Sequence, residues 1–127
     1  MPLMPHIAVP LALAPGSIKF ARDATQRWLR DIDRAVDEGS AAVVVSELVT
    51  NSVLHAQAPI VLHLWDEKVD SVRIGVADGS TTVACNEPVQ PGARSGRGLH
   101  LIEKFACGWG SDVHDRGKLT WADLPAT

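Results

Sequence analysis

The chain has 127 residues, 46% of them apolar, which suits one domain whose core needs no metal or disulfide. Its formal net charge of −3 provides no basic excess for phosphates, so direct nucleic-acid binding is not expected. No apolar run reaches the roughly 20 residues of a membrane-spanning helix, and the two cysteines form no C-x-x-C motif. These features predict a single cytoplasmic domain over residues 1–127, without a membrane segment.

The first third of the chain predicts a strand followed by a helix. Residues 6–11 are strand-like, and Pro10 suits an edge strand because it cannot donate to a ladder. Ser17 is the expected N-cap of a helix over residues 18–32. Apolar residues at three- and four-residue spacing predict the buried face of this helix: Phe20, Ala21, Ala24, Trp28 and Leu29.

Acidic residues at 37–38 favour the start of a second helix, expected from about residue 40 to 55 or 56. Residues 60–65 and 72–78 then read as two strands joined by a polar turn. Residues 79–97 contain two prolines and three glycines without periodicity, which indicates either a lid or a surface loop.

The chain closes with a predicted helix over residues 98–106 and two strands, 109–114 and 118–124. Helices are thus grouped, and the strands come in hairpins. This order predicts an α+β fold: a two-layer sandwich of a mostly antiparallel sheet with helices on one face.

The second predicted helix carries a polar stripe of Glu47, Asn51 and His55 at four-residue spacing, well round the helix from an apolar stripe. A carboxamide oxygen suits magnesium, and a carboxylate one turn away can orient or deprotonate a hydroxyl. A solvated polar face explains the same spacing, and the spacing alone does not decide between the two.

Asp78 continues the apolar face of the 72–78 strand, where a carboxylate is costly unless hydrogen-bonded. A ligand amino group would provide a partner, although an Asp that simply begins a turn is an equal alternative. In residues 95–99, glycines at a helix start let backbone N–H groups approach a phosphate, but such glycines also end flexible loops.

In this order the three segments resemble the GHKL superfamily of ATPases, which includes gyrase and the histidine kinases. Glu47-Leu-Val-Thr-Asn51-Ser-Val-Leu-His55 is similar to its N box, and Val76-Ala-Asp78-Gly-Ser80 to its first glycine box. Ser95-Gly-Arg-Gly98-Leu is similar to the second glycine box, and residues 117–124 to the closing strand. The short form is similar to the anti-sigma-factor serine kinases, especially small actinobacterial regulators.

The resemblance implies that Asn51 ligates the Mg²⁺ that bridges the ATP phosphates and that Glu47 acts as general base or orients the attacking hydroxyl. It implies that Asp78 accepts a hydrogen bond from the adenine amino group, and that backbone around Gly96 and Gly98 holds phosphates. The residues then expected at ATP are Asn51, His55, Asp78, Gly79, Ser80, Ser95, Gly96, Arg97, Gly98, Leu99 and Thr120.

The chain departs from the superfamily pattern in two places. Ser80 and Thr82 replace the later glycines of the first box, and Leu119 takes the place of a common threonine, with Thr120 next. The resemblance implies a protein that sequesters a sigma factor and phosphorylates a STAS-type anti-anti-sigma antagonist, with dimerisation also common. The altered glycine box favours the alternative of a binding module without phosphotransfer. An isolated ATPase is a third possibility, which the absence of a transducer domain disfavours.

Overall fold

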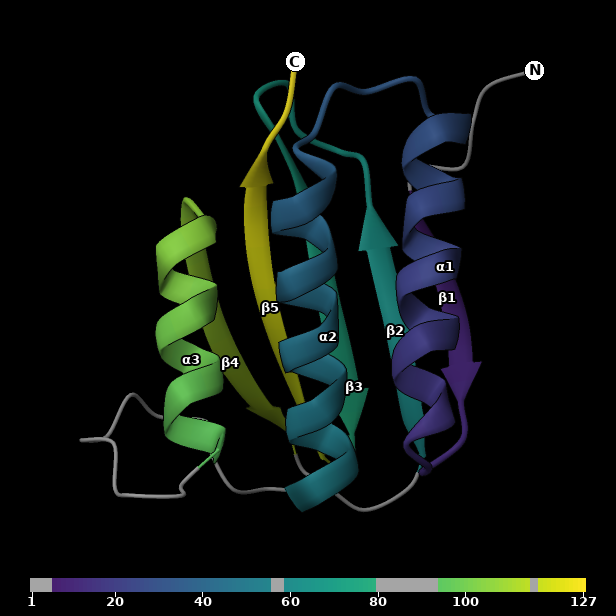
Figure 1. Cartoon of the computed structure of the whole chain (residues 1–127), viewed down its shortest axis with the longest axis vertical. Helices are drawn as coiled ribbons and strands as arrows, with labels where there is room; N and C mark the ends of the chain where they lie inside the picture. The colour runs from purple at the N-terminus through teal and green to yellow at the C-terminus, as the bar shows by residue number, and fades with distance from the viewer. Residues whose placement is uncertain (1–5, 56–58, 80–93, 115–116) are drawn as a thin grey trace.

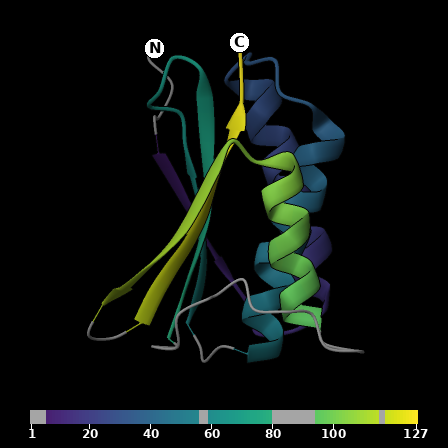
Figure 2. The same cartoon turned by 90° about the vertical axis from the view of Figure 1, so that its left-hand side faces the viewer.

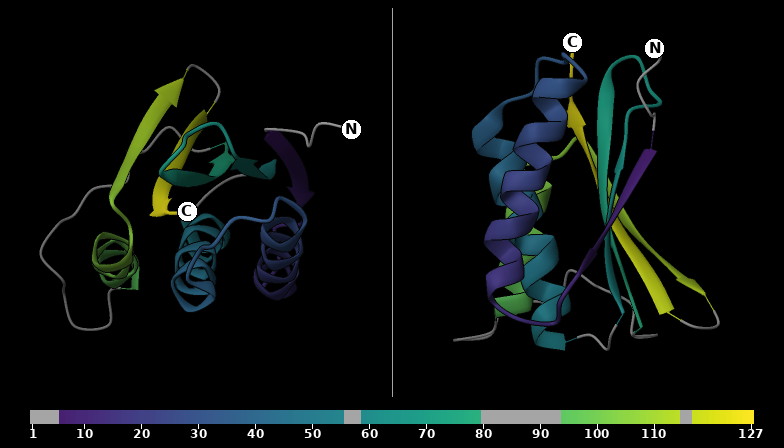
Figure 3. Two further views of the ribbon diagram at one scale, coloured as in Figure 1. Left: turned by 90° about the horizontal axis from the view of Figure 1, so that it is seen from above. Right: turned by 90° about the vertical axis from the view of Figure 1, so that its right-hand side faces the viewer.

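The computed structural model describes residues 6–55, 59–79, 94–114 and 117–127. Its strands form one antiparallel sheet in the order β1-β2-β3-β5-β4. Three helices cover one face of this sheet and leave the other uncovered (Figures 2 and 3). The elements are β1 (His6–Leu11), α1 (Gly16–Asp31), α2 (Glu38–His55), β2 (Ile60–Trp65), β3 (Ser71–Asp78), α3 (Arg94–Phe105), β4 (Gly108–His114) and β5 (Gly117–Pro125). The predicted α+β sandwich is confirmed.

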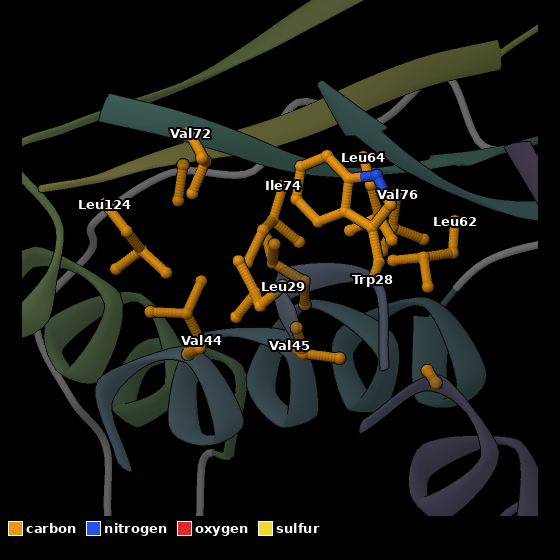
Figure 4. Close-up of a cluster of buried hydrophobic side chains, with 14 of the residues drawn as sticks. Trp28, Leu29, Val44, Val45, Leu62, Leu64, Val72, Ile74, Val76 and Leu124 are labelled. Atoms are coloured by element: carbon orange, nitrogen blue, oxygen red, sulfur yellow. The ribbon is translucent and has the colours of Figure 1, made fainter. Parts of the chain in front are cut away.

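The core lies between the helices and the sheet. Side chains on β2 alternate between buried and half-buried positions, as expected for a strand with one covered face. Trp28 of α1 and Val45 of α2 meet Ile74 of β3 in this layer (Figure 4). The largest fully buried side chains are Leu48, Ile60, Leu62, Leu64, Ile74, Ile102, Leu124, Val44, Val45, Val49, Val72 and Val76. The predicted strand faces therefore form the core.

Two expectations for the first helix are wrong. Ser17 is not the N-cap, because α1 already begins at Gly16 and the Ser17 hydroxyl donates to the Ala12 carbonyl at 2.7 Å. Phe20 is 57% exposed, whereas Thr25 takes a buried position and donates its hydroxyl to the Ala21 carbonyl. The apolar stripe of α1 is thus narrower than its composition suggests, because packing against α2 and the sheet leaves Phe20 in solvent.

The other two helices begin earlier in the sequence than predicted. Helix α2 begins at Glu38, where the Asp37 carboxylate accepts hydrogen bonds from the Gly39 amide and the Ser40 hydroxyl. Helix α3 begins at Arg94 instead of residue 98, so the last part of the predicted lid over 79–97 is helical. Residues 80–93 of that lid lie outside the described residues.

At the end of the molecule where both α2 and β3 begin, one arginine connects several segments by hydrogen bonds (Figure 1). Arg34, between α1 and α2, donates to the Asp66 carboxylate and to the carbonyls of Lys68 at 3.0 Å and Val69 at 2.7 Å. It also donates to the Thr127 carbonyl at 3.3 Å. A guanidinium suits this role because its donors form a rigid planar fork. The contact fixes the β2–β3 turn and the chain end against the helical layer.

A second charged group holds the uncovered face of the sheet. Arg73 of β3 donates twice to the Asp123 carboxylate of β5, at 2.7 and 3.0 Å, and stacks on the ring of Trp121. Lys68 donates to the same carboxylate at 3.2 Å. Burial by itself would raise the pKa of Asp123, but the hydrogen bonds from Arg73 and Lys68 outweigh it and leave the pKa below its usual value.

Candidate functional site

Helix α2 separates a buried stripe from a polar stripe, as its sequence predicts. Val45, Leu48 and Val49 are buried against the sheet, whereas Glu47 and Asn51 are half-buried and lie one turn apart. The helix ends at His55, which follows Asn51 by one helical turn. A carboxylate and a carboxamide are thus held at the border between the core and solvent, where both can meet a ligand.

Asp78 ends β3 with its carboxylate in the interior, only 5% exposed. The hydroxyl of Ser52, on α2, donates to Asp78 Oδ2 at 2.9 Å. The predicted need for a hydrogen-bond partner is confirmed, and within the described residues a serine provides one such bond. A carboxylate offers about four acceptor positions, so it can accept from several donors at once. Gly79 follows directly, half-buried, and Ser80 lies outside the described residues.

Strand β5 brings two further polar side chains to the same face. Lys118 is the register partner of Asp78 and Thr120 that of Val76, so both share the face that the helices cover. Lys118 is 6% exposed and Thr120 is 3% exposed. The Thr120 hydroxyl lies 3.1 Å from that of Ser111 on β4. Lysines are seldom this buried unless paired, and the strand register places Lys118 opposite Asp78 on the same face of the sheet.

Gly117 permits this arrangement through a backbone contact. A Cβ atom at Gly117 would collide with the carbonyl oxygen of Asp78, which belongs to the backbone and cannot swing aside. Only glycine therefore lets β5 begin so close to the end of β3. The resulting approach sets where Asp78 and Lys118 project.

The second glycine segment lies inside a helix instead of preceding one. Residues 95–99 belong to the first two turns of α3. The N–H groups of an N-cap and of the first three helical residues have no partner within the helix, so the free donors inside α3 belong to residues 94–96. Gly96 falls within this group, whereas Arg97, Gly98 and Leu99 follow it. The contact of Ser95, Gly96, Arg97, Gly98 and Leu99 with phosphate stays a prediction.

These pieces meet at one end of the molecule. In Figure 1 the C-terminal end of α2, the end of β3, the start of β5 and the start of α3 all lie at the lower end. A helix N-terminus is favourable for anions because its N–H groups and dipole point outward. The fold thus places the start of α3 at the same end as the buried carboxylate and the polar stripe.

Two residues at this end of the molecule, Ser52 and Lys118, are absent from the site residues that the sequence predicts. A hydroxyl among buried aliphatic residues is the signal that could have identified Ser52, because buried polar groups require partners. A lysine that alternates with the buried Ala122 and Leu124 on one face of the strand is the matching signal for Lys118.

Comparison with known proteins gives one kind of match. No family model matches the chain, and neither does any curated protein. Its structure is similar to the crystal structure of the RsbU and RsbW domains of Rv1364c from Mycobacterium tuberculosis, with a TM-score of 0.65 and 20% identity. The match covers 98% of this chain and 33% of that one, so the chain spans about a third of that structure's length.

This likeness shows that the chain shares its fold with that structure. Among the described residues, no three or more His, Cys, Asp or Glu side chains gather as metal ligands. Magnesium commonly uses one or two protein oxygens together with phosphates, so the Asn51 carboxamide fits such a role without a cluster. No helix in the described part of the chain is long and apolar enough to cross a membrane.

Proposed function

We propose that this GHKL-type chain binds ATP with Mg²⁺ and acts as an anti-sigma regulator with serine/threonine-protein kinase activity. The observation that carries the proposal is the buried Asp78 carboxylate, which accepts a hydrogen bond from Ser52 of α2. The half-buried Glu47 and Asn51 lie on the same helix as Ser52. This arrangement offers an acceptor for an amino group, with a metal ligand and a base on the neighbouring helix. The structural likeness to RsbW supports the same reading at the level of the fold.

Each residue then has a defined task. Asp78 accepts a hydrogen bond from the adenine amino group, and Asn51 holds Mg²⁺ through its carboxamide oxygen. Glu47 orients or deprotonates the hydroxyl that receives the phosphoryl group, while the first turn of α3 binds phosphate. When bound, ATP would supply the γ-phosphoryl group, and Mg²⁺ would offset the negative charge on the phosphate oxygens during transfer. Positioning and charge stabilisation are the main contributions a protein makes to this reaction.

The proposed partners are a sigma factor, which the protein sequesters, and a STAS-type antagonist, which it phosphorylates on serine or threonine. The similar structure includes the RsbW domain of Rv1364c, and this likeness supports a partner-switching role of this kind. The uncovered face of the sheet is available for a second copy of the chain, so a homodimer belongs to the proposal.

Calorimetric titration with ATP and ADP, with and without Mg²⁺, tests nucleotide binding. Asn51→Ala should remove the magnesium-dependent part of the affinity, and Ser46→Ala on the same helix is the control. Glu47→Gln should bind ATP normally but fail to transfer phosphate to a STAS protein encoded beside the gene. Normal transfer by Glu47→Gln would refute the general-base role, and no binding up to millimolar ATP would refute the nucleotide site.

A second function has a specific observation in its favour. The segment after Asp78 reads Gly79-Ser80-Thr81-Thr82, which lacks the later glycines of the superfamily box. The loss of these glycines favours a module that acts by sequestering its partner, with ATP bound but not cleaved. Magnesium-dependent binding without phosphotransfer to any STAS protein would select this function.

A further inference from the structure

The uncovered face of the sheet holds two histidines in direct contact, next to a tryptophan. His6 on β1 and His63 on β2 approach with Nε2 of His6 2.8 Å from Nδ1 of His63. The Trp65 ring centre lies 5.0 Å from that of His6 and 5.2 Å from that of His63, with planes inclined by 13° and 11°. None of these side chains belongs to the site around Asp78, which faces the helices.

The two imidazoles meet edge to edge. Their ring centres are 5.1 Å apart, whereas the facing nitrogens are only 2.8 Å apart, so these nitrogens point toward each other. Imidazole nitrogen is a preferred ligand of zinc, copper and nickel ions. A tetrahedral ion with Zn–N bonds of about 2.0–2.1 Å separates two ligand nitrogens by roughly 3.3 Å. To accept an ion the pair therefore has to open by about half an ångström, and the rings have to turn so that both lone pairs point at the ion instead of at each other.

The surroundings allow this small opening. In the described sheet β1 is an edge strand that pairs with β2, so it can shift without disturbing a further strand. Trp65, in contrast, is held in place because its ring lies over Gly75, where a Cβ atom would come within 2.9 Å of it. Trp65 is thus held in place, whereas His6, on the edge strand, is the ligand that can move most.

Proton balance also permits metal binding. The hydrogen bond between the rings requires that one of the two facing nitrogens carries a proton. When that proton moves to the other nitrogen of the same ring, both facing nitrogens present lone pairs. Each ring stays neutral with one N–H, so the ion replaces the bridging proton without any ring changing its charge.

We propose that His6 and His63 form a site for one divalent transition-metal ion of the zinc, copper or nickel class. Water completes the coordination, since a zinc ion normally takes four ligands. The bound ion links the edge strand β1 to β2 and thereby stabilises the sheet. Mg²⁺ does not compete, because it prefers oxygen ligands.

The test titrates the full chain with Cu²⁺ and with Zn²⁺. Copper at the histidine pair should quench Trp65 fluorescence with one-to-one saturation, and zinc should raise Tm, because a ligand that binds only the folded state stabilises it. A chelator should reverse both effects. His6→Gln and His63→Gln should each weaken binding at least about tenfold, the loss already typical for outer-shell partners of a metal.

Two matched controls separate this site from incidental binding. His100→Gln removes an exposed histidine on α3 and should bind copper and zinc like the wild type. Trp65→Phe should lose most of the quenching but keep the zinc-dependent rise in Tm. Unchanged metal affinity in a folded His6→Gln chain, checked by circular dichroism, would overturn the proposal. So would several ions binding with equal affinity, or a loss of binding in His100→Gln as large as in His63→Gln.

Discussion

The hydrogen bond from Ser52 to Asp78 provides the sharpest test of the site, because it joins α2 to the end of β3. Ser52→Ala removes a hydroxyl that is 3% exposed from a carboxylate that is 5% exposed, so water does not readily replace it. A hydrogen bond to a charged group contributes about 1.5–3 kcal/mol to stability. Alanine improves helix propensity by roughly 0.5 kcal/mol, so the expected net loss is about 1–2.5 kcal/mol.

Chemical denaturation followed by circular dichroism measures this loss directly. Ser46→Ala, a partly exposed serine on the same helix, provides the matched control because it receives the same gain in propensity. The double variant Ser52→Ala with Asp78→Asn isolates the coupling, which should be favourable by at least about 0.5 kcal/mol. Equal stability of Ser52→Ala and Ser46→Ala, or zero coupling, would refute the role assigned to this bond. ATP affinity should also fall in Ser52→Ala, because the carboxylate loses the group that orients it.

Three further predictions concern other parts of the fold. Gly117→Ala should cost about 1–3 kcal/mol or more of stability, because its Cβ collides with the Asp78 carbonyl; a wild-type denaturation midpoint would contradict this. Arg34→Lys should cost about 1–3 kcal/mol, because an ammonium cannot reproduce the planar set of donors, and a midpoint equal to wild type would exclude this. Since folding lowers the pKa of Asp123, its ionisation stabilises the fold above the unfolded pKa of about 3.9, and this contribution disappears as pH falls through the lower folded value. The stability difference between wild type and Asp123→Asn should therefore shrink on acidification from pH 5, and a constant difference would disprove the link to Arg73.

Much of the candidate site follows from local pattern. Spacing by four residues places Glu47 and Asn51 on one face of a helix whatever the rest of the fold does, and the structure confirms both stripes of α2. Alternation along β3 likewise predicts that Asp78 points inward, and it does. Both inferences succeed because the repeat of a helix or strand fixes side-chain direction within a few residues.

Prediction fails where packing competes with propensity. Two glycines in residues 95–99 argue against a helix, since each costs about 1 kcal/mol relative to alanine, yet α3 begins at Arg94. Burial of Ile102 shows how tightly this helix packs, and tertiary packing supplies most of the stability of a short helix. The prediction that Phe20 is buried is also wrong, because its side of α1 meets no other described element closely enough to bury it.

By itself, the sequence determined the order of strands and helices, the antiparallel two-layer class and the inward direction of Asp78. These properties depend on hydrophobic periodicity, which is local. The tertiary structure alone decided which partners meet: Ser52 with Asp78 across 26 positions, and His6 with His63 across 57. Such contacts depend on the register between strands and on the placement of helices against the sheet. Strand register and helix placement both depend on burial and backbone pairing across the whole domain. No single segment of the chain therefore determines them.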